Sequence, residues 1–206
     1  MLRPYEPLLS IVPEGWGVIG ALGGTAVLML AGGAVLAPAM IAAALMPAAA
    51  RFWADPRSGI ACKPRGVLAP LDGTVIHRRE CHDPILGREA IRIVVRTRFW
   101  GPYCLRAPIA GDVMPLPPGV HAPGVSRIRA EDGQDLLIRV TRGSLLGSRP
   151  VMVGVGERVG QGRRCGLRRL AREIELIVPA GWRVDAQLGQ RVRSGQTLLA
   201  TMLRKS

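Results

Sequence analysis

The sequence predicts a mostly β domain that follows an N-terminal membrane-associated helical hairpin. Two observations lead to this prediction. The segment from Gly15 to Ala50 contains no charged residue, whereas the chain beyond residue 60 alternates short apolar runs with Gly and Pro. The chain has 206 residues, which suits one domain with an appendage. We therefore expect a membrane anchor in residues 1–50 and a β domain in residues 51–206.

The uncharged segment mixes Leu, Val, Ile and Met with Gly and Ala, a composition typical of a membrane segment. Arg3, Glu6 and Glu14 make a poor positive region for a signal peptide. Two membrane forms fit: a single span, or a hairpin broken near Gly32-Gly33 or at Pro38. Each hairpin arm would be shorter than the ~20 residues of a full span. A pair of apolar core helices is the alternative without a membrane.

The charge of the chain is carried by arginine. The formal net charge is +13, from 28 Lys+Arg and 15 Asp+Glu, and only Lys63 and Lys205 are lysines. Arg51, Arg57 and Arg65 follow the apolar segment, so the positive-inside rule places the β domain on the cytoplasmic face of the inner membrane. Anionic phospholipid headgroups would attract such a domain. A nucleic acid is a weaker candidate, because few aromatic side chains are available to stack on bases.

Five runs beyond residue 60 have the length and the β-branched composition of strands. They are residues 73–76, 91–95, 135–140, 151–153 and 173–178. Short strands at close intervals favour an all-β sandwich or barrel.

Two pairs of segments repeat within this region. Residues 69–75 resemble residues 107–113, and residues 156–162 resemble residues 189–195. The second pair follows G-x-x-V-x-x-G, a pattern common in flattened sandwiches of the biotinyl/lipoyl type. We therefore expect a barrel-sandwich-hybrid-like β domain. Neither lysine lies in a predicted hairpin turn, which argues against a biotin or lipoyl carrier.

Several motifs follow the apolar segment in a fixed order. They are RFWADPR (51–57), APLDGTV (69–75), LRAPIAGDV (105–113), VGERVGQG (155–162), GLRR (166–169), VPAG (178–181) and GQRVRSGQT (189–197). Their order and spacing resemble those of the short, membrane-anchored phosphatidylserine decarboxylases. The resemblance covers essentially the whole chain.

This resemblance implies a particular chemistry. In that family the serine of a Gly-Ser bond attacks the preceding carbonyl, and the chain cleaves itself to leave a pyruvoyl group. The pyruvoyl ketone forms a Schiff base with phosphatidylserine and accepts the electrons released as CO2 leaves. An Asp in the first Asp-Gly motif and a His before the Arg-Ala-Pro motif assist the cleavage.

Only part of this machinery matches the chain. Asp72 matches the family Asp, whereas Tyr103 stands where the His is expected. The family segment Gly-Leu-Ile-Arg-Phe-Gly-Ser aligns with residues 166–172, so Ala171 and Arg172 replace Gly-Ser. Arginine has no hydroxyl to attack a carbonyl, and a phenol with an ordinary pKa of about 10 is a poor base at neutral pH. We therefore expect no pyruvoyl cofactor and a vestigial Asp72.

The sequence thus favours a catalytically inactive relative in phospholipid metabolism. It would bind an anionic phospholipid membrane or an integral membrane protein. The candidate lipid-phosphate ligands are Arg106, Arg168, Arg169 and Arg172. The alternatives are an active decarboxylase that makes phosphatidylethanolamine and a basic nucleic-acid-binding protein. The oligomeric state is left open.

The remaining candidates have simpler explanations. His77, Cys81 and His82 cluster in sequence without a fourth metal ligand, so we expect no metal site. Cys104 and Cys165 are expected to be buried as small apolar side chains. His121 is either a lipid contact or a surface residue, and the bonds Gly143-Ser144 and Gly147-Ser148 lie well before the segment that matches the cleavage strand.

Overall fold

The computed structural model describes residues 9–11, 13–31, 36–56, 63–98, 103–120, 122, 124–142, 151–168 and 171–203. The chain divides into two compact units, residues 1–58 and 59–206.

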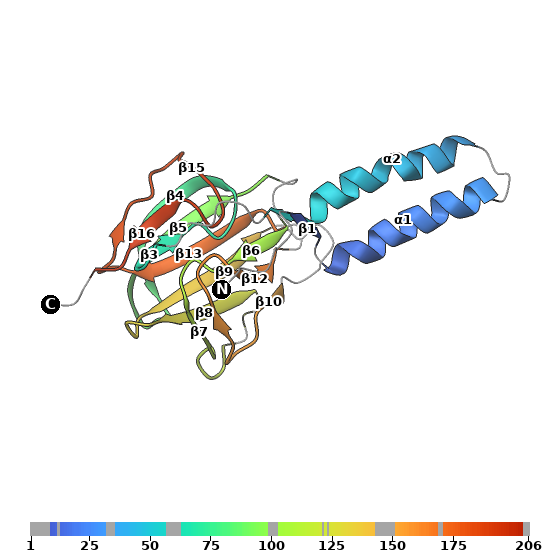
Figure 1. Cartoon of the computed structure of the whole chain (residues 1–206). Coiled ribbons are helices and arrows are strands. Elements are labelled where there is room, and N and C mark those ends of the chain that lie inside the picture. Colours follow the sequence, from blue (N-terminus) through green and yellow to red (C-terminus); the bar gives the residue numbers. More distant parts are fainter. Residues whose placement is uncertain are drawn as a thin grey trace, which may run out of the picture. The chain divides into compact units, whose positions relative to one another are not determined.

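The first unit contains two helices, α1 (Pro13–Ala31) and α2 (Leu36–Trp53), which pack side by side (Figure 1). A short antiparallel ladder connects the segments outside them. In this ladder β1 (Leu9–Ile11) precedes α1 and pairs with β2 (Ala54–Pro56), which follows α2. The ladder therefore brings the start and the end of the unit together.

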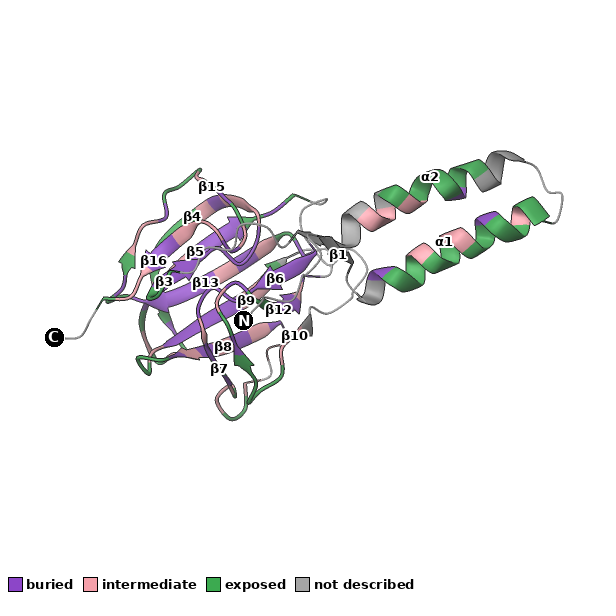
Figure 2. Cartoon of the chain, viewed as in Figure 1, coloured by how far each residue is buried: buried purple, intermediate pink, exposed green. Residues whose placement is uncertain are grey.

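Both helices expose large apolar side chains. They are Trp16, Val18, Val27, Leu28 and Leu30 on α1, and Met40, Ile41 and Leu45 on α2. Figure 2 shows exposed positions along both helices. Over the part of each helix that the structure describes, neither combines the length and the apolarity needed to cross a membrane. The association of this unit with a membrane stays a prediction.

The second unit is built of antiparallel strands, so the prediction of a mostly β fold is confirmed. The strands are β3 (Gly66–Leu68), β4 (Gly73–Asp83), β5 (Arg88–Arg96), β6 (Cys104–Arg106), β7 (Gly111–Met114), β8 (Val125–Ala130), β9 (Asp135–Arg142), β10 (Val151–Met152), β11 (Arg158–Val159), β12 (Arg164–Leu167), β13 (Glu173–Pro179), β14 (Arg183–Val184), β15 (Arg191–Val192) and β16 (Leu198–Thr201). The five predicted strand runs fall on β4, β5, β9, β10 and β13. The sheets of the described residues do not close into a barrel.

The strands of the second unit form pairs of equivalent strands, one counted from each end of the largest sheet. The largest sheet has the order β11-β7-β8-β9-β13-β5-β4-β15, and two smaller sheets have the orders β10-β12-β6 and β14-β16-β3. If β7 corresponds to β4, then β8 corresponds to β5, β9 to β13, β11 to β15, and one small sheet to the other. The second unit therefore consists of two related halves.

Hydrogen bonds between the repeated segments confirm this relation. The Leu68 amide donates to the Pro108 carbonyl, and the Arg106 amide donates to the Pro70 carbonyl, both at 2.9 Å. Each half thus gives the other the same bond, which is the pattern of a twofold axis. The relation also explains why residues 69–75 and 107–113 have similar sequences, since both occupy the same place in their halves.

Glycine is required at the matching position of both repeats. A Cβ on Gly73 would collide with the Arg96 carbonyl oxygen, and a Cβ on Gly111 would collide with the Arg129 carbonyl oxygen. At both places the paired strand approaches too closely for a side chain.

The side chains of β13 show how the large sheet forms the core. Ile174, Leu176 and Val178 lie in the main cluster, whereas Ile177 lies in a smaller cluster with Leu137. Alternate residues of a strand point to opposite faces, so the sheet buries apolar side chains on both. The main cluster is aliphatic apart from one tryptophan and one cysteine.

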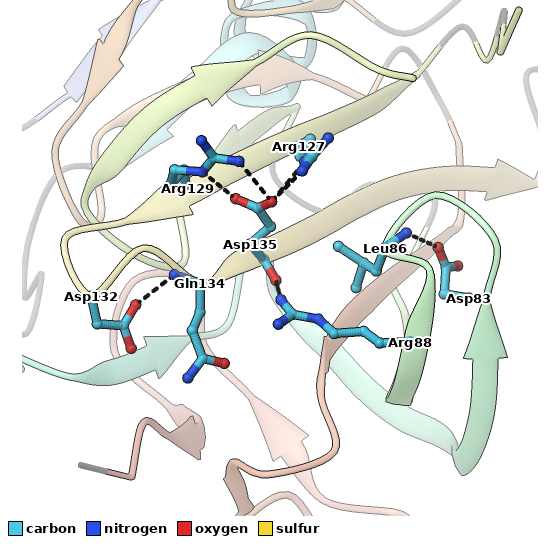
Figure 3. A network of polar contacts seen from close by, with 8 residues as sticks. All are labelled: Asp83, Leu86, Arg88, Arg127, Arg129, Asp132, Gln134 and Asp135. Atoms are coloured by element: carbon cyan, nitrogen blue, oxygen red, sulfur yellow. Dashed lines mark hydrogen bonds and ion pairs between the residues drawn. The ribbon is translucent and has the colours of Figure 1, made fainter. Parts of the chain in front are cut away.

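Arginines bind a largely buried carboxylate on the face of the sheet opposite the main core (Figure 3). Arg127 and Arg129 on β8 donate to the Asp135 carboxylate on β9, with Arg129 Nε 2.8 Å from Asp135 Oδ1. Arg88 Nη2 donates to the Asp135 carbonyl at 3.1 Å. Asp135 therefore links three strands, β5, β8 and β9.

These contacts make part of the stability depend on pH. Burial raises the pKa of Asp135, but hydrogen bonds and charges from Arg129 and Arg127 outweigh it and hold the pKa below its ordinary value. The stabilisation is therefore complete above the unfolded pKa of about 3.9 and is lost as the pH falls through the folded pKa. We expect Asp135→Asn to lower the free energy of unfolding at neutral pH by about 1–2 kcal/mol. Urea unfolding of the full chain in detergent, followed across acidic and neutral pH, measures this.

The matched control is Asp132→Asn. The Asp132 carboxylate accepts a hydrogen bond from the Gln134 amide at 3.0 Å, which asparagine can also accept, so its stability should stay near that of the wild type. A similar loss in both variants, or none in either, would contradict the role assigned to Asp135.

Candidate functional site

The positions that match the cleavage machinery of the family lie at one end of neighbouring strands. Asp72 directly precedes β4, Arg172 directly precedes β13, and both strands pair with β5. The register aligns them, since Thr74 pairs with Arg96 and Arg96 pairs with Glu173. Strands on either side of a third are about 10 Å apart. The fold therefore brings Asp72 and Arg172 to the same edge of the sheet.

Tyr103 and Arg168 reach this edge from the small sheet. Tyr103 precedes β6, Arg168 follows β12, and the Arg168 amide donates to the Tyr103 carbonyl at 3.0 Å. Arg168 is also bonded to Ala171, because the Ala171 amide donates to the Arg168 carbonyl at 2.9 Å and Arg168 Nη1 donates to the Ala171 carbonyl at 3.0 Å. The Arg168 side chain thus holds the carbonyl that precedes Arg172, which is the carbonyl attacked in the family mechanism.

Arg168 is a buried cation, since its side chain is 0% exposed. Burial lowers the pKa of Arg168, the charge interaction with Tyr103 opposes this, the charge of Arg172 adds to it, and the resulting pKa is about 10. The guanidinium therefore stays protonated at neutral pH. Arg168 and Arg172 therefore place two positive charges at this edge, which also holds the Asp72 carboxylate.

Asp72 has a structural partner here. Its Oδ1 accepts a hydrogen bond from the Ser194 amide at 2.6 Å, and Ser194 Oγ donates to the Pro70 carbonyl at 3.1 Å. Asp72 thereby ties the segment before β4 to the turn that follows β15. Together with the need for glycine at position 73, this explains the Asp-Gly motif without any catalysis.

The four arginines predicted to bind lipid phosphate have different surroundings. Arg106 is buried, and its Nη1 donates to the Gly162 carbonyl at 2.8 Å. Arg168 is buried as described above, whereas Arg172 is exposed. Arg169 lies outside the described residues. Arg172 is therefore the one exposed side chain among the three described arginines.

The fold separates the cluster of His77, Cys81 and His82. Cys81 and His82 are neighbours in β4 and point to opposite faces, and His82 Nδ1 lies 3.0 Å from Glu89 Oε1. Nowhere in the described part of the chain do three His, Cys, Asp or Glu side chains gather in a way that could hold a metal ion.

The two cysteines near the site are buried, as predicted. Burial raises the pKa of Cys165 to about 12, so this thiol is not ionised at neutral pH and is a poor nucleophile. His121, Gly143-Ser144 and Gly147-Ser148 lie outside the described residues.

The sequence did not indicate two of the contacts that shape this edge. The bond between Asp72 and Ser194 joins segments more than a hundred residues apart, although the repeat that contains Ser194 was visible. The burial of Arg168 was also missed, because an arginine within a basic run is expected to be solvated. The isoleucine at this position in the family segment was a signal of burial.

We expect Asp72→Asn to keep the stability and the lipid binding of the wild type, because asparagine can still accept the Ser194 bond. Asp72→Ala should lower the free energy of unfolding by about 1–2 kcal/mol. Urea unfolding and vesicle binding of both variants test this. If Asp72→Asn removed a measurable function while the protein stayed folded, the carboxylate would have a chemical role.

Comparisons with known proteins give a consistent result. The phosphatidylserine decarboxylase proenzyme of Nitrosomonas europaea is 28% identical, over 97% of this chain and 99% of its own length. That of Nitrosomonas eutropha is 29% identical over the same shares, and that of Burkholderia multivorans is 26% identical over 74% of this chain and 78% of its own. No protein-family model matches the chain.

Among solved structures, the glucose permease IIA from Mycoplasma capricolum is similar at a TM-score of 0.45 and 19% identity. The match covers 66% of this chain and 93% of that one, and at this level it adds nothing to the assignment. The ordered motifs and the relatives that match over nearly their full length support the assignment of the chain to the phosphatidylserine decarboxylase family.

Proposed function

We propose that this chain is a membrane-bound member of its family that does not form a pyruvoyl group and instead binds anionic phospholipid. The observation that carries the proposal is Arg172, an exposed cation at the position of the cofactor-forming serine.

The chemistry of self-cleavage supports the loss. The reaction needs a hydroxyl at position 172, a base near it and a carbonyl that becomes an ester. Arg172 offers no hydroxyl, and Tyr103 stands in place of the helper histidine. The Ala171 carbonyl accepts a hydrogen bond from Arg168, but the arginine at position 172 has no hydroxyl that could attack this carbonyl.

The charges at this edge favour an anion as ligand. Arg172 lies beside the buried guanidinium of Arg168, and a second cation strengthens the attraction for a phosphate or a carboxylate. A phospholipid headgroup supplies such a group, and the family acts on phospholipids. The helices of the first unit support a membrane location, since their exposed apolar side chains would be covered by lipid. We place the β domain on the cytoplasmic face of the inner membrane, and we propose that the two related halves form a barrel-sandwich hybrid.

The intact mass tests the loss of cleavage. We expect the chain purified in detergent to remain a single polypeptide of 22.0 kDa that does not react with hydrazine. Two shorter chains, one of them with a hydrazine-reactive ketone at its N-terminus, would show an active decarboxylase and overturn the proposal. The masses of those chains would identify the bond that was cut.

Vesicle binding tests the ligand. We expect Arg172→Gln to weaken binding to phosphatidylserine vesicles about fivefold, since a basic residue close to an anionic surface contributes about 1 kcal/mol. Arg79→Gln, which removes an exposed arginine from β4, is the control and should change binding less. Cosedimentation with phosphatidylserine and phosphatidylcholine vesicles measures both.

Equal losses in the two variants, or equal binding to the two lipids, would contradict a specific site at Arg172. Capture of an integral membrane protein without any lipid preference would favour that partner instead.

A further inference from the structure

A cavity of about 750 Å³ lies at the opposite edge of the β domain from the site described above, at the position related to it by the twofold axis. Its lining comes from the segment before β3, the loop before β7, the turn between β8 and β9, and the end of β16. Equivalent hydrogen bonds in the two halves establish this correspondence.

The first equivalence concerns the cleavage position. The Thr97 amide donates to the Arg172 carbonyl at 2.8 Å, and the Ala130 amide donates to the Gln134 carbonyl at 2.8 Å. Thr97 directly follows β5, and Ala130 is the last residue of β8. Because β5 and β8 are equivalent strands, Thr97 and Ala130 occupy equivalent positions. Gln134, which lines the cavity, therefore occupies the place of Arg172.

The second equivalence concerns Tyr103 and Arg168. The Arg168 amide donates to the Tyr103 carbonyl at 3.0 Å, and the Met202 amide donates to the Arg65 carbonyl at 2.8 Å. Arg65 and Met202 both line the cavity and take the places of Tyr103 and Arg168.

The third equivalence concerns Asp72. Ser194 Oγ donates to the Pro70 carbonyl at 3.1 Å, and Gln161 Nε2 donates to the Pro108 carbonyl at 3.3 Å. The alignment of the repeats then puts Ala110, another lining residue, in the place of Asp72. The cleavage edge is the end of the sheet that holds Asp72, Tyr103, Arg168 and Arg172, and each of these four residues thus has a counterpart at the cavity.

The cavity differs from the cleavage edge in its charges. Lys63 and Arg65 contribute two cations from the segment before β3, while Glu131 and Asp132 contribute two carboxylates from the β8–β9 turn. Figure 3 shows Asp132 beside Gln134 at that turn. Glu131 also pairs with Arg158 at 3.1 Å. The cavity therefore presents both signs of charge from two different elements.

Apolar side chains complete the lining. They are Ile109, Ala110, Ala130, Met202 and Leu203. An apolar lining with a few polar groups is the usual composition of a site for a small organic ligand. Both signs of charge together with an apolar surface suit a zwitterion that carries an apolar part.

Arg65 is held in an unusual backbone conformation. Its φ is 65°, and among the described residues it is the one non-glycine residue with a positive φ. The Gly66 amide donates to the Lys63 carbonyl at 2.8 Å, so residues 63–66 form a turn with Pro64 second and Arg65 third. A proline followed by a positive φ is the pattern of a type II turn, whose third position favours glycine. An arginine at such a position strains the backbone, and strained residues cluster at functional sites.

We propose that this cavity binds a phosphate ester that carries an ammonium group, as in an ethanolamine phospholipid headgroup. The phosphate would lie toward Lys63 and Arg65, the ammonium toward Asp132 and Glu131, and the glycerol end on the apolar lining. The choice of a phosphate rather than a carboxylate rests on the proposed phospholipid function. The charge pattern of the cavity is independent of that function.

The test uses the full chain in maltoside micelles and titrates it with glycerophosphoethanolamine, followed by calorimetry. We expect saturable binding that is at least tenfold tighter than that of glycerol 3-phosphate or ethanolamine, each of which has one of the two charges. Phosphatidylethanolamine added to the micelles is a parallel arm. Tighter binding there identifies the lipid as the source of the headgroup, and equal binding identifies the free ester.

Two variants remove charge from the cavity with little expected effect on the fold. Arg65→Gly places glycine at the positive φ, and Asp132→Asn keeps the hydrogen bond to the Gln134 amide. Each should weaken binding at least fivefold without lowering the unfolding temperature. Arg79→Gln is the control, because it removes an exposed arginine that does not line the cavity and should leave this binding unchanged.

No saturable binding by the folded wild type would overturn the proposal, as would variants at Arg65 and Asp132 that bind like the wild type. Loss of binding in Arg172→Gln alone would move the ligand to the other edge and also overturn it. Failure of the proposed function appears separately, as cleavage in the intact mass.

Discussion

The β domain depends on a reciprocal exchange of backbone hydrogen bonds between its two halves. Leu68 bonds to Pro108 as Arg106 bonds to Pro70, so each repeat completes the small sheet of the other. Glycines 73 and 111 permit the matching close approach of the strands in the large sheet. Neither half could satisfy these backbone groups alone, and unpaired buried amides are costly. The two halves therefore form one cooperative core.

This exchange also fixes what lies at the two edges of the domain. The same backbone framework presents Tyr103, Arg168 and Arg172 at one edge, and Arg65, Met202 and Gln134 at the other. Because the two edges share this backbone framework, their side chains alone determine how the edges differ. One edge holds the cations Arg168 and Arg172 near Asp72, and the other combines both charges with an apolar lining. A symmetric scaffold can in this way carry two unlike sites.

Much of the fold could be predicted because β periodicity is a local property of the sequence. The alternation of residues 173–178 predicted β13, and the repeated segments seen in the sequence lie at matching places in the two halves. The residues of the cleavage edge could be identified from the sequence, since Asp72 and Arg172 are found by matching motifs. The burial of Arg168 could not, because it depends on Tyr103 and Ala171, which reach it only through pairing of distant strands. The cavity beside Arg65 could not be predicted either, because its lining comes from segments that are far apart in the sequence.

The sequence by itself determined the uncharged N-terminal segment, the strands, the repeats, the resemblance to the family and the missing serine at position 172. These properties are read from composition, local periodicity and residue identity, which need no knowledge of partners in space. Only the tertiary structure decided that Asp72 bonds to Ser194, that Arg168 is buried while Arg172 is exposed, and that a cavity lies at the related edge. Burial and hydrogen bonding depend on which strands become neighbours, and the reciprocal pairing of the two halves makes that choice.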